Sequence, residues 1–259
     1  MFNKRIKQIA AFSLVAVMGL FAFTGCGSKD DDKIVLGTSA DYPPFEFMDT
    51  EQNILGFDLM IAEEIAKDMG KELEVKNMEF NSLLTALQTD KIDMILSGMN
   101  PDEERRKTVD FSEIYYLSKH YVVVNADKAD SIKKEADLNG KKIGVQIGTT
   151  QEKLAREKFP GSEIVALGSI QDILLQLKTN KLDAAITEDA VAKNAVNSNK
   201  DLVLPGIEYE DEEGGVAVAV RKDSPELVEQ INKTIKRLQD ENKIEEFFDE
   251  AVRLSSENE

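Results

Sequence analysis

Residues 82–98 read SLLTALQTDKIDMILSG and residues 172–188 read DILLQLKTNKLDAAITE, two copies of one pattern at an offset of 90 positions. In each copy, apolar residues three apart predict a helix, and a polar turn follows it. A short apolar run then predicts a strand, at Ile92–Leu96 in the first copy and at Leu182–Ile186 in the second. Because only two copies exist, the repeat indicates two similar α/β lobes rather than a solenoid.

The rest of the chain continues this alternation of short strands and helices. Residues 33–38 and 142–149 are apolar runs that both end in Gly-Thr. Over residues 57–69 apolar side chains recur every four positions, which predicts a core-facing helix. The alternation predicts an α/β fold with two lobes, each a mostly parallel sheet flanked by helices, and a ligand cleft between the lobes.

The expected sheets indicate where a ligand would bind. Ligands of such sheets lie beyond the carboxyl ends of the strands. By this rule four loops are candidates: residues 38–45, 97–105, 148–151 and 187–189. The first two loops belong to one lobe and the other two to the second, so lobes that face each other would bring all four together across one cleft.

The composition excludes several classes of function. A formal charge of −17 over 259 residues argues against nucleic acid, because a polyanion would be repelled. The single cysteine allows no intramolecular disulfide and no cysteine-rich zinc or redox site. The sequence has no metal-ligand cluster, glycine-rich phosphate loop or evident Ser/His/Asp arrangement, so we expect no cofactor and no metal. His120, the one histidine, falls in a predicted strand and is interpreted as structural.

The first 25 residues differ from the rest of the chain. A basic start at residues 4–7 precedes 15 uncharged residues, 9–23, which are too few to span a bilayer that takes about 20. This pattern is typical of a signal peptide. Cys26 follows small residues, so cleavage before it and attachment of a palmitate-bearing lipid would explain a lone cysteine here. An ordinary secreted chain or a membrane anchor with an incidental cysteine is the alternative. Residues 26–32 are small, polar and charged, as in a solvated tether.

The loop after the first copy carries groups that suit an anion. Gly98 lets backbone N–H groups approach a ligand, and Asn100 can donate through its amide. Arg105 offers a planar fork that pairs with a carboxylate through two hydrogen bonds. Alternatively, this loop is a helix-entry turn, and Arg105 makes a surface pair with Asp102 or Glu104.

The second lobe contributes both donors and acids. Thr149 and Thr150 precede a predicted helix, whose N-terminus would favour a carboxylate, although simple capping by a threonine also fits. Glu188 and Asp189 follow the second copy, where one of them could hold an ammonium group or both could lie in a solvated loop. Together the donors accept a carboxylate and the acids accept an amine, which a small zwitterion satisfies at once.

These residues resemble the polar amino-acid-binding proteins of ABC importers, the bacterial extracellular solute-binding proteins of family 3. The resemblance covers about residues 33–250. The matching stretches are GTSADYPPFEF (37–47), GFDLMIAEEIA (56–66), LLTALQTDKIDMILSGMNPDEERRKTVDFSEIYY (83–116), GKKIGVQIGTTQEKL (140–154), DAAITEDAVA (183–192) and VAVRKDSPEL (218–227).

The resemblance implies roles for individual residues in the first lobe. Tyr42 would stack on the ligand and Phe80 would close the other side, although core packing is the alternative for such aromatics. Backbone groups of Ser97 and Gly98 would take the amine. Ser39 stands where many members have an aspartate that reaches the ligand side chain, and this difference argues against a basic ligand. Asp41 is close enough in the sequence to supply that carboxylate instead.

Further roles follow for the ligand's charged ends. Arg105 would be the carboxylate-pairing arginine, with Asn100 in place of the usual threonine or serine. Thr149 and Thr150 would add donors to that carboxylate. Glu188 would bind the α-amino group, at a position where members of the family more often have an aspartate. Because Asp189 is the next residue, it could take this role instead.

The resemblance also implies an organisation and a function. The chain would cross between lobes near Val124–Asp127 and Glu213–Val216, which gives a first lobe of residues 33–124 and 216–259 and a second lobe of 125–215. We expect a monomeric receptor on the extracytoplasmic face of the membrane, not an enzyme, that hands a free amino acid to an ABC permease. A tethered signalling receptor and an enzyme on the same fold, such as a dehydratase, are the alternatives.

Overall fold

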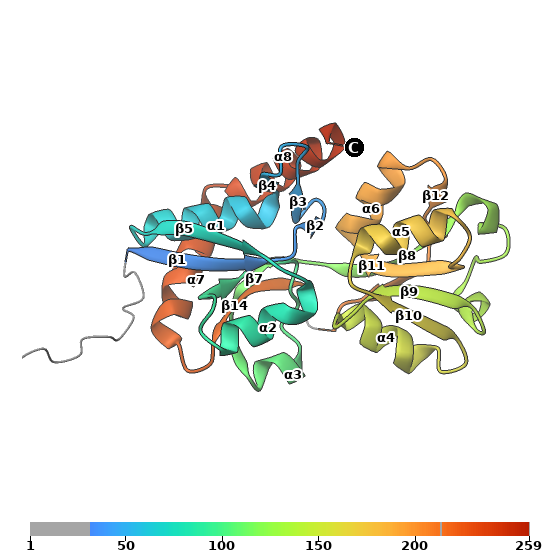
Figure 1. Cartoon of the computed structure of the whole chain (residues 1–259), viewed down its shortest axis with the longest axis horizontal. Coiled ribbons are helices and arrows are strands. Elements are labelled where there is room, and N and C mark those ends of the chain that lie inside the picture. Colours follow the sequence, from blue (N-terminus) through green and yellow to red (C-terminus); the bar gives the residue numbers. More distant parts are fainter. Residues whose placement is uncertain (1–31, 213, 259) are drawn as a thin grey trace, which may run out of the picture. The chain divides into compact units, whose positions relative to one another are not determined.

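The computed structural model describes residues 32–212 and 214–258, so the predicted signal peptide and Cys26 lie outside the described residues. From Asp32 onward the chain forms one compact unit. Its strands are assembled in two larger sheets, one in each lobe, and one small sheet (Figure 1).

The sheet of the first lobe has the strand order β5-β1-β6-β14-β7. Its strands are β1 (Lys33–Thr38), β5 (Glu72–Asn77), β6 (Met94–Ile95), β7 (Val109–Tyr116) and β14 (Val216–Arg221). Its helices are α1 (Phe57–Asp68), α2 (Phe80–Gln88), α3 (Glu103–Arg106), α7 (Pro225–Asp240) and α8 (Lys243–Glu257). The small sheet, β2 (Asp41–Tyr42), β3 (Glu46–Met48) and β4 (Ile54–Leu55), follows β1 in the chain.

The sheet of the second lobe has the order β10-β9-β11-β8-β12, and β13 also pairs with β8. Its strands are β8 (Lys119–Asn125), β9 (Lys142–Gln146), β10 (Glu163–Leu167), β11 (Ala184–Glu188), β12 (Leu202–Val203) and β13 (Glu208–Glu210). Its helices are α4 (Thr150–Lys158), α5 (Ile170–Lys178) and α6 (Asp189–Ser198), with short 3₁₀ turns at Ala126–Lys128 and Glu135–Leu138.

The two-lobed α/β fold predicted from the repeat is confirmed, and the sheets are mixed. In the first sheet β1 runs parallel to β5 and β6, whereas β14 is antiparallel to β6 and β7. In the second sheet β9 runs parallel to β10 and β11, whereas β8 is antiparallel to β11. The expected parallel pairing therefore holds for the strands joined by helices and not for the strands that follow or precede a crossing between lobes.

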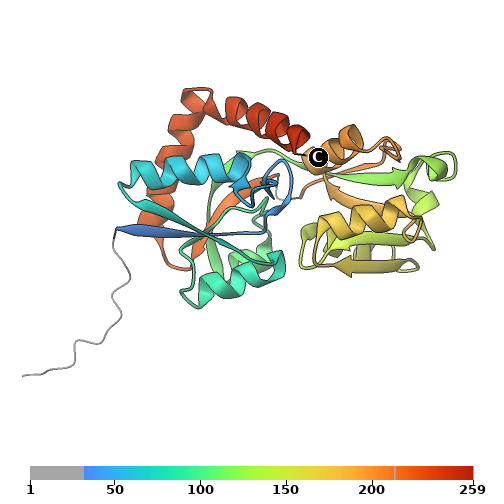
Figure 2. The same ribbon diagram turned by 45° about the horizontal axis from the view of Figure 1, so that its top comes forward.

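Both sheets are covered by helices on two faces, so their strands are buried on both sides. Along β14, Val218 packs in a cluster with α1 and α7, and its neighbour Ala219 packs in a cluster with α2. Successive strand residues point to opposite faces, so this alternation places α1 and α2 on opposite faces of the sheet, as Figure 2 also shows. In the second lobe α4 and α5 cover opposite faces in the same way.

The sequence repeat corresponds to equivalent packing in the two lobes. Helices α2 and α5 begin and end at residues 90 positions apart. A glycine of the adjacent strand lies under each repeat unit: a Cβ on Gly37 would lie 2.3 Å from Ile92 and 3.1 Å from Leu83, and a Cβ on Gly144 would lie 2.5 Å from Leu182 and 2.9 Å from Ile173. The repeat therefore encodes a strand–helix unit in which the helix lies close to the backbone of the neighbouring strand.

The first crossing between lobes differs from the predicted position. Strand β8 pairs with β11, β12 and β13 of the second sheet, so the chain leaves the first lobe at residues 117–118, after β7, and not near Val124–Asp127. The return lies between β13, which ends at Glu210, and β14, which begins at Val216. The predicted boundary fails because a short apolar strand such as β8 carries no local sign of the sheet that it joins.

The C-terminal helices pack on the first lobe. Both α7 and α8 contact α1, as expected for the return segment. Helix α8 also reaches the second lobe, where Ser255 Oγ donates a hydrogen bond of 2.8 Å to Asn194 Oδ1 of α6. Both residues are buried, so this contact adds a third connection between the lobes beside the two chain crossings.

Candidate functional site

The four predicted loops are brought together by hydrogen bonds between the lobes. Tyr42 Oη lies 2.8 Å from Thr187 Oγ1, which joins the loop after β1 to the end of β11. Asn100 Nδ2 donates to Glu188 Oε1 at 2.7 Å, which joins the loop after β6 to the same strand. Arg105 Nη2 donates to Gly148 O at 2.9 Å, which brings in the loop after β9. The carboxyl ends of strands from both sheets therefore share one buried region.

Asn100 lies at the centre of this region and is buried. Its Nδ2 donates to Glu188 Oε1 and to Asp211 Oδ2 at 2.8 Å, and lies 3.3 Å from the carbonyl oxygen of Gly215. Its Oδ1 accepts a hydrogen bond of 3.1 Å from Thr150 Oγ1. One amide side chain of the first lobe thus contacts β11, the helix α4 and the return crossing at 211–215.

Arg105 is a buried guanidinium with a fully specified orientation. It is 5% exposed, and its Nη1 donates to Asn100 O at 2.6 Å. Its guanidinium lies over the ring of Phe80 at 5.4 Å, a cation–π distance. Its Nε is 3.7 Å from Asp102 Oδ2, so the expected pairing with Asp102 exists, but it is buried rather than on the surface. Burial lowers the pKa of Arg105, and the carboxylates of Asp102 and Glu188 oppose that shift.

Glu188 and Asp189 point in different directions. Glu188 is completely buried and contacts Asn100, and its Oε2 has no hydrogen-bond partner among the described residues. Burial raises the pKa of Glu188 well above its usual value, and the hydrogen bond from Asn100 opposes this shift. Asp189 Oδ2 instead accepts a hydrogen bond of 2.6 Å from Lys193 of the same helix. Of the two registers considered, Glu188 is the one that faces the loops of the first lobe.

The two threonines of the α4 loop have different partners. Thr149 is the N-cap of α4, where its Oγ1 accepts from the backbone N–H of Glu152 at 3.2 Å and donates to Gln146 O at 2.7 Å. The Thr149 hydroxyl therefore caps helix α4, which is the alternative given above to a ligand contact. Thr150 Oγ1 points across to Asn100.

Ser97 and Gly98 are held from behind by two carboxyl groups that the sequence did not single out. Ser97 Oγ donates to Glu46 Oε1 at 2.8 Å, and the N–H of Gly98 donates to Asp58 Oδ2 at 2.8 Å. Ser97 Oγ also accepts from the backbone N–H of Ser39 at 3.0 Å. Glu46 lies between two phenylalanines and Asp58 within an apolar helix, and a charge inside an apolar run was the one available signal for both.

Ser39 and Asp41 form a further link between the lobes. Ser39 Oγ donates to Asp41 Oδ1 at 2.9 Å. Asp41 Oδ2 accepts from the N–H of Ile170, at the start of α5, at 3.0 Å and from Gln146 Nε2 at 3.3 Å. Burial raises the pKa of Asp41, and these hydrogen bonds lower it.

The predicted aromatic residues do not form a pair. Tyr42 stacks on Phe45, with ring centroids 6.1 Å apart, and its hydroxyl contacts Thr187. Phe80, the first residue of α2, packs in a cluster with β14, and the guanidinium of Arg105 lies over its ring. Tyr42 and Phe80 therefore have different partners in the region, and each also belongs to a core cluster.

Buried carboxyl groups outnumber buried cations in the described part of the chain. Within residues 32–212 and 214–258 the buried carboxyl groups are those of Glu46, Asp58, Glu188, Asp189 and Asp211, and the buried guanidinium or ammonium group is that of Arg105. Of these carboxyl groups, Asp189 pairs with Lys193. Buried charges require complete partners, because an uncompensated one costs several kcal/mol. This arrangement can therefore accept a carboxylate at Arg105 and favours positive charge elsewhere.

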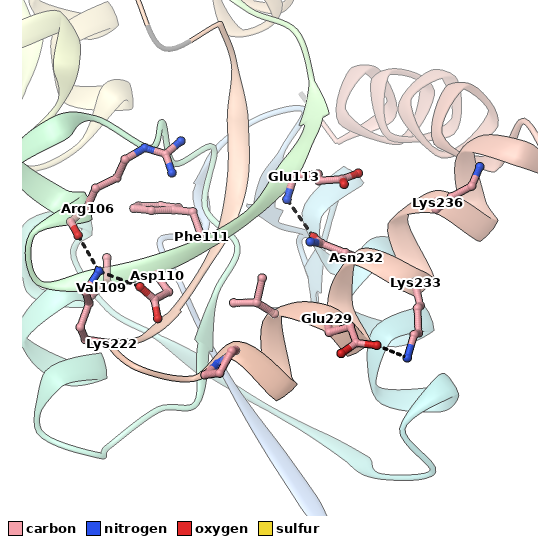
Figure 3. Close-up of a pocket in the computed structure, with 12 residues that line it drawn as sticks. Arg106, Val109, Asp110, Phe111, Glu113, Lys222, Glu229, Asn232, Lys233 and Lys236 are labelled. Carbon is pink, nitrogen blue, oxygen red and sulfur yellow. Dashed lines mark hydrogen bonds and ion pairs between the residues drawn. The ribbon is translucent and has the colours of Figure 1, made fainter.

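A broader groove lies on the outer side of the first lobe, between β7 and α7 (Figure 3). Its volume is about 730 Å³, and its three lysines are already paired: Lys222 with Asp110 at 2.8 Å, Lys233 with Glu229 at 2.6 Å and Lys236 with Asp240 at 2.9 Å. It has no buried charge among its lining residues. The smaller region where the strand ends meet, with its buried Arg105 and Glu188, is thus the better candidate for a binding site.

Two kinds of feature are absent from the described part of the chain. No described helix combines the length and the hydropathy that crossing a bilayer requires. Among the same residues, no three or more histidine, cysteine or acidic side chains are placed to hold a metal ion.

Known proteins share both the sequence and the fold. Residues 34–252 match the family described as bacterial extracellular solute-binding proteins, family 3. The arginine-binding extracellular protein ArtP of Bacillus subtilis is 43% identical over 245 residues, which cover 90% of this chain and 94% of ArtP.

Two solved structures illustrate the likeness of the fold. AbpA, an amino acid ABC transporter substrate-binding protein from Streptococcus pneumoniae bound to L-arginine, has a TM-score of 0.84 and 33% identity, covering 86% of this chain and 96% of AbpA. Holo ArgBP from T. maritima has a TM-score of 0.74 and 39% identity, covering 80% of this chain and 91% of ArgBP. This chain therefore belongs to the bacterial extracellular solute-binding proteins of family 3 and is an amino-acid-binding protein of the ABC-transporter type.

Proposed function

We propose that this protein is a lipid-anchored receptor that captures a cationic amino acid, arginine first, between its two lobes and delivers it to an ABC permease. The observation that supports the proposal is that one buried guanidinium, Arg105, accompanies several buried carboxyl groups, and that Glu188 among them has an oxygen without a hydrogen-bond partner in the described residues. A ligand with one carboxylate and two positive groups complements that charge distribution. The arginine-binding relatives ArtP and AbpA support the same choice.

Arg105 would bind the ligand carboxylate, with help from the α4 loop. Its guanidinium now donates to two backbone carbonyls, at Asn100 and Gly148, which lie on opposite lobes. A carboxylate placed there would add a charged partner to a group that burial has stripped of water. The Thr150 hydroxyl and the Asn100 amide would supply further donors, and the N-terminus of α4 would add the favourable end of its dipole.

Glu188 would bind the α-amino group. Its Oε2 is buried without a hydrogen-bond partner among the described residues, so it has an acceptor to offer. An ammonium group would neutralise a carboxylate whose pKa burial has raised, and would hold it in the ionised form. Backbone groups of Ser97 and Gly98, and the ring of Tyr42, would complete the contacts on the first lobe. Asp41, fixed by Ser39, would lie nearest to the far end of the side chain.

Binding would favour closure of the lobes. Arg105, Asn100 and Tyr42 come from the first lobe, while Glu188 and Thr150 come from the second. A ligand that contacts both sets binds the closed arrangement better than an open one, so it shifts the equilibrium towards closure. The crossings at 117–118 and 211–215 are where the backbone would bend. The closed monomer would be the form that the permease recognises.

The N-terminal segment would place this receptor at the membrane. Residues 1–25 would be removed as a signal peptide, Cys26 would carry the lipid, and residues 26–32 would tether the folded part on the extracytoplasmic face. Replacement of Cys26 by serine tests the anchor: the wild type should sediment with membranes after expression in a bacterium that modifies lipoproteins, and Cys26→Ser should be released. Equal membrane association of both would contradict a lipid anchor.

A thermal-shift screen tests the binding function. The folded part, residues 32–259, would be heated with each of the twenty amino acids, ornithine and cystine. A ligand that binds only the folded state raises the melting temperature. We expect the largest increases with arginine, then lysine and ornithine. A largest increase with cystine or glutamine would contradict a cationic ligand, and no increase with any of them would contradict amino-acid capture.

A further inference from the structure

Two carboxyl groups, those of Glu46 and Asp58, lie directly behind the loop that ends β6. Both side chains are 1% exposed. Glu46 Oε1 accepts from Ser97 Oγ at 2.8 Å, and Asp58 Oδ2 accepts from the N–H of Gly98 at 2.8 Å. Neighbouring residues of one loop are therefore held by neighbouring acids, one from β3 and the other from α1.

Both carboxyl oxygens of Asp58 accept hydrogen bonds, whereas one carboxyl oxygen of Glu46 has no donor among the described residues. Asp58 Oδ1 accepts from Tyr115 Oη at 2.8 Å, in addition to the Gly98 contact on Oδ2. Glu46 Oε2 is buried and has no donor among the described residues. The backbone N–H of Asp58 donates to Phe45 O at 2.9 Å, so the chain brings Glu46 and Asp58 side by side behind Ser97 and Gly98. An acceptor facing an acceptor is repulsive, but a proton on Glu46 would allow it to donate a hydrogen bond to Asp58.

The surroundings favour one proton on the pair. The pKa of Glu46 is raised well above its usual value, first by burial and then by the Asp58 carboxylate, while burial raises the pKa of Asp58 to about 6. The titratable groups facing the pair are Tyr115, which donates to Asp58, and the carboxylates of Asp41 and Glu188, which add negative charge. Two adjacent buried carboxyl groups cannot both be ionised cheaply.

We propose that Glu46 and Asp58 hold one proton between them, carried by Glu46, and that this pair is a positioning device that fixes Ser97 and Gly98 for the ligand. The proposal rests on the proposed function in so far as the loop contacts an amino acid. Gly98 has a φ of +53°, a conformation favoured by glycine, and its N–H donates to Asp58 Oδ2. Asp58 fixes the direction of that N–H, and Glu46 fixes the Ser97 side chain beside it.

Two isosteric substitutions separate the roles of the partners. In Glu46→Gln, the amide oxygen accepts from Ser97 and the amide N–H₂ donates to Asp58, so the pattern of a protonated Glu46 is retained. In Asp58→Asn, one of the two acceptor oxygens is lost, so Gly98 or Tyr115 loses its acceptor. Exposed Glu63→Gln, on the same helix as Asp58, is the matched control for removal of a negative charge.

Calorimetric titration with L-arginine at pH 7 tests the asymmetry. We expect Glu46→Gln and Glu63→Gln to bind within about threefold of the wild type, and Asp58→Asn to bind at least about tenfold more weakly. A loss in Glu46→Gln as large as that in Asp58→Asn would overturn the proton assignment. Urea unfolding of each variant shows whether a loss of binding reflects loss of the fold.

Carbon NMR of the wild-type side-chain carboxyl groups tests the proton directly and needs neither variant nor ligand. At pH 7 the Glu46 signal should have the chemical shift of a carboxylic acid and the Asp58 signal that of a carboxylate. Two carboxylate signals would overturn the proposal. If the wild type binds no amino acid but Glu46 is protonated, the proposed function fails and the proton assignment stands. If the protein binds arginine but shows two carboxylate signals, the proposed function stands and the proton assignment fails.

Discussion

Glu188 Oε1 accepts a hydrogen bond of 2.7 Å from Asn100 Nδ2, and this contact joins the two lobes between the ends of corresponding strands, β6 and β11. Glu188 occupies in the second copy of the repeat the place that Gly98 has in the first. The equivalent positions therefore differ: the Gly98 N–H donates to Asp58 within the first lobe, whereas the Glu188 carboxylate at the end of β11 accepts from the first lobe.

Replacement of Arg105 by alanine should weaken arginine binding by about 2–5 kcal/mol, as removal of one member of a buried charged pair does. The neighbouring Arg106 is exposed and stacks on Phe111, so Arg106→Ala is the control. Isothermal titration calorimetry measures both. Equal affinities of the two variants would contradict the role of Arg105.

The carboxylates at 188 and 189 should differ in the same assay. Glu188→Gln removes the buried charge that would meet the α-amino group, so arginine affinity should fall at least about tenfold. Asp189→Asn removes a charge that already pairs with Lys193, so its affinity should stay within about threefold of the wild type. A larger loss in Asp189→Asn than in Glu188→Gln would place the amine at the other register.

The close packing of the repeat unit predicts a stability difference between two glycines. A Cβ on Gly144 would lie 2.9 Å from the branched Cγ2 of Ile173, so Gly144→Ala should destabilise the protein by about 1–3 kcal/mol. A Cβ on Gly161 would meet nothing within 4 Å, so Gly161→Ala should change the free energy of unfolding by less than about 1 kcal/mol. Urea unfolding distinguishes them, and similar stabilities would show that the repeat helix is not held so tightly.

How much of this arrangement the sequence predicts depends on whether the information is local. The spacing of Leu84, Leu87 and their counterparts predicts the repeat helices, and the apolar stripe over 57–69 predicts α1 (Phe57–Asp68). The four loops could be predicted because the ends of parallel strands meet at one edge of a sheet. These features follow from periodicity within a dozen residues.

The features that were missed depend on long-range contacts. Strand β8 joins the second sheet only because β11 pairs with it some sixty residues later, so the first crossing was expected too late in the chain. Glu46 and Asp58 look like ordinary charges until Ser97 and Gly98 are placed against them. The N-cap role of Thr149 was foreseen as an alternative, because capping depends on residues that are close in sequence.

The single histidine predicts a pH dependence of stability. Burial lowers the pKa of His120 below 6.5, although Asp211, with its Oδ1 4.0 Å from Nε2, opposes the shift. The folded protein then binds fewer protons than the unfolded chain just below pH 6.5, so the free energy of unfolding falls as the pH falls through that value.

Measurement of unfolding in urea at pH 7.5 and pH 5.5 isolates this effect. The stability advantage of the wild type over His120→Gln should shrink between these pH values by at most about 1.4 kcal/mol. Gln151 Nε2 lies 3.1 Å from His120 Nδ1, so Gln151→Glu, which adds a carboxylate there, should raise the histidine pKa and reduce the shrinkage. An advantage that grows at pH 5.5 would mean that the folded state favours the protonated ring.

If the buried carboxyl groups select a ligand with a positively charged side chain, a calorimetric comparison of L-arginine with L-citrulline should show it. The two ligands have the same chain length and nearly the same shape, but the ureido group of citrulline is neutral and has a carbonyl acceptor where the guanidinium of arginine has an NH₂ donor. Loss of a charged hydrogen bond costs about 1.5–3 kcal/mol, so arginine should bind at least about tenfold more tightly than citrulline. Equal affinities, or tighter binding of citrulline, would contradict the account.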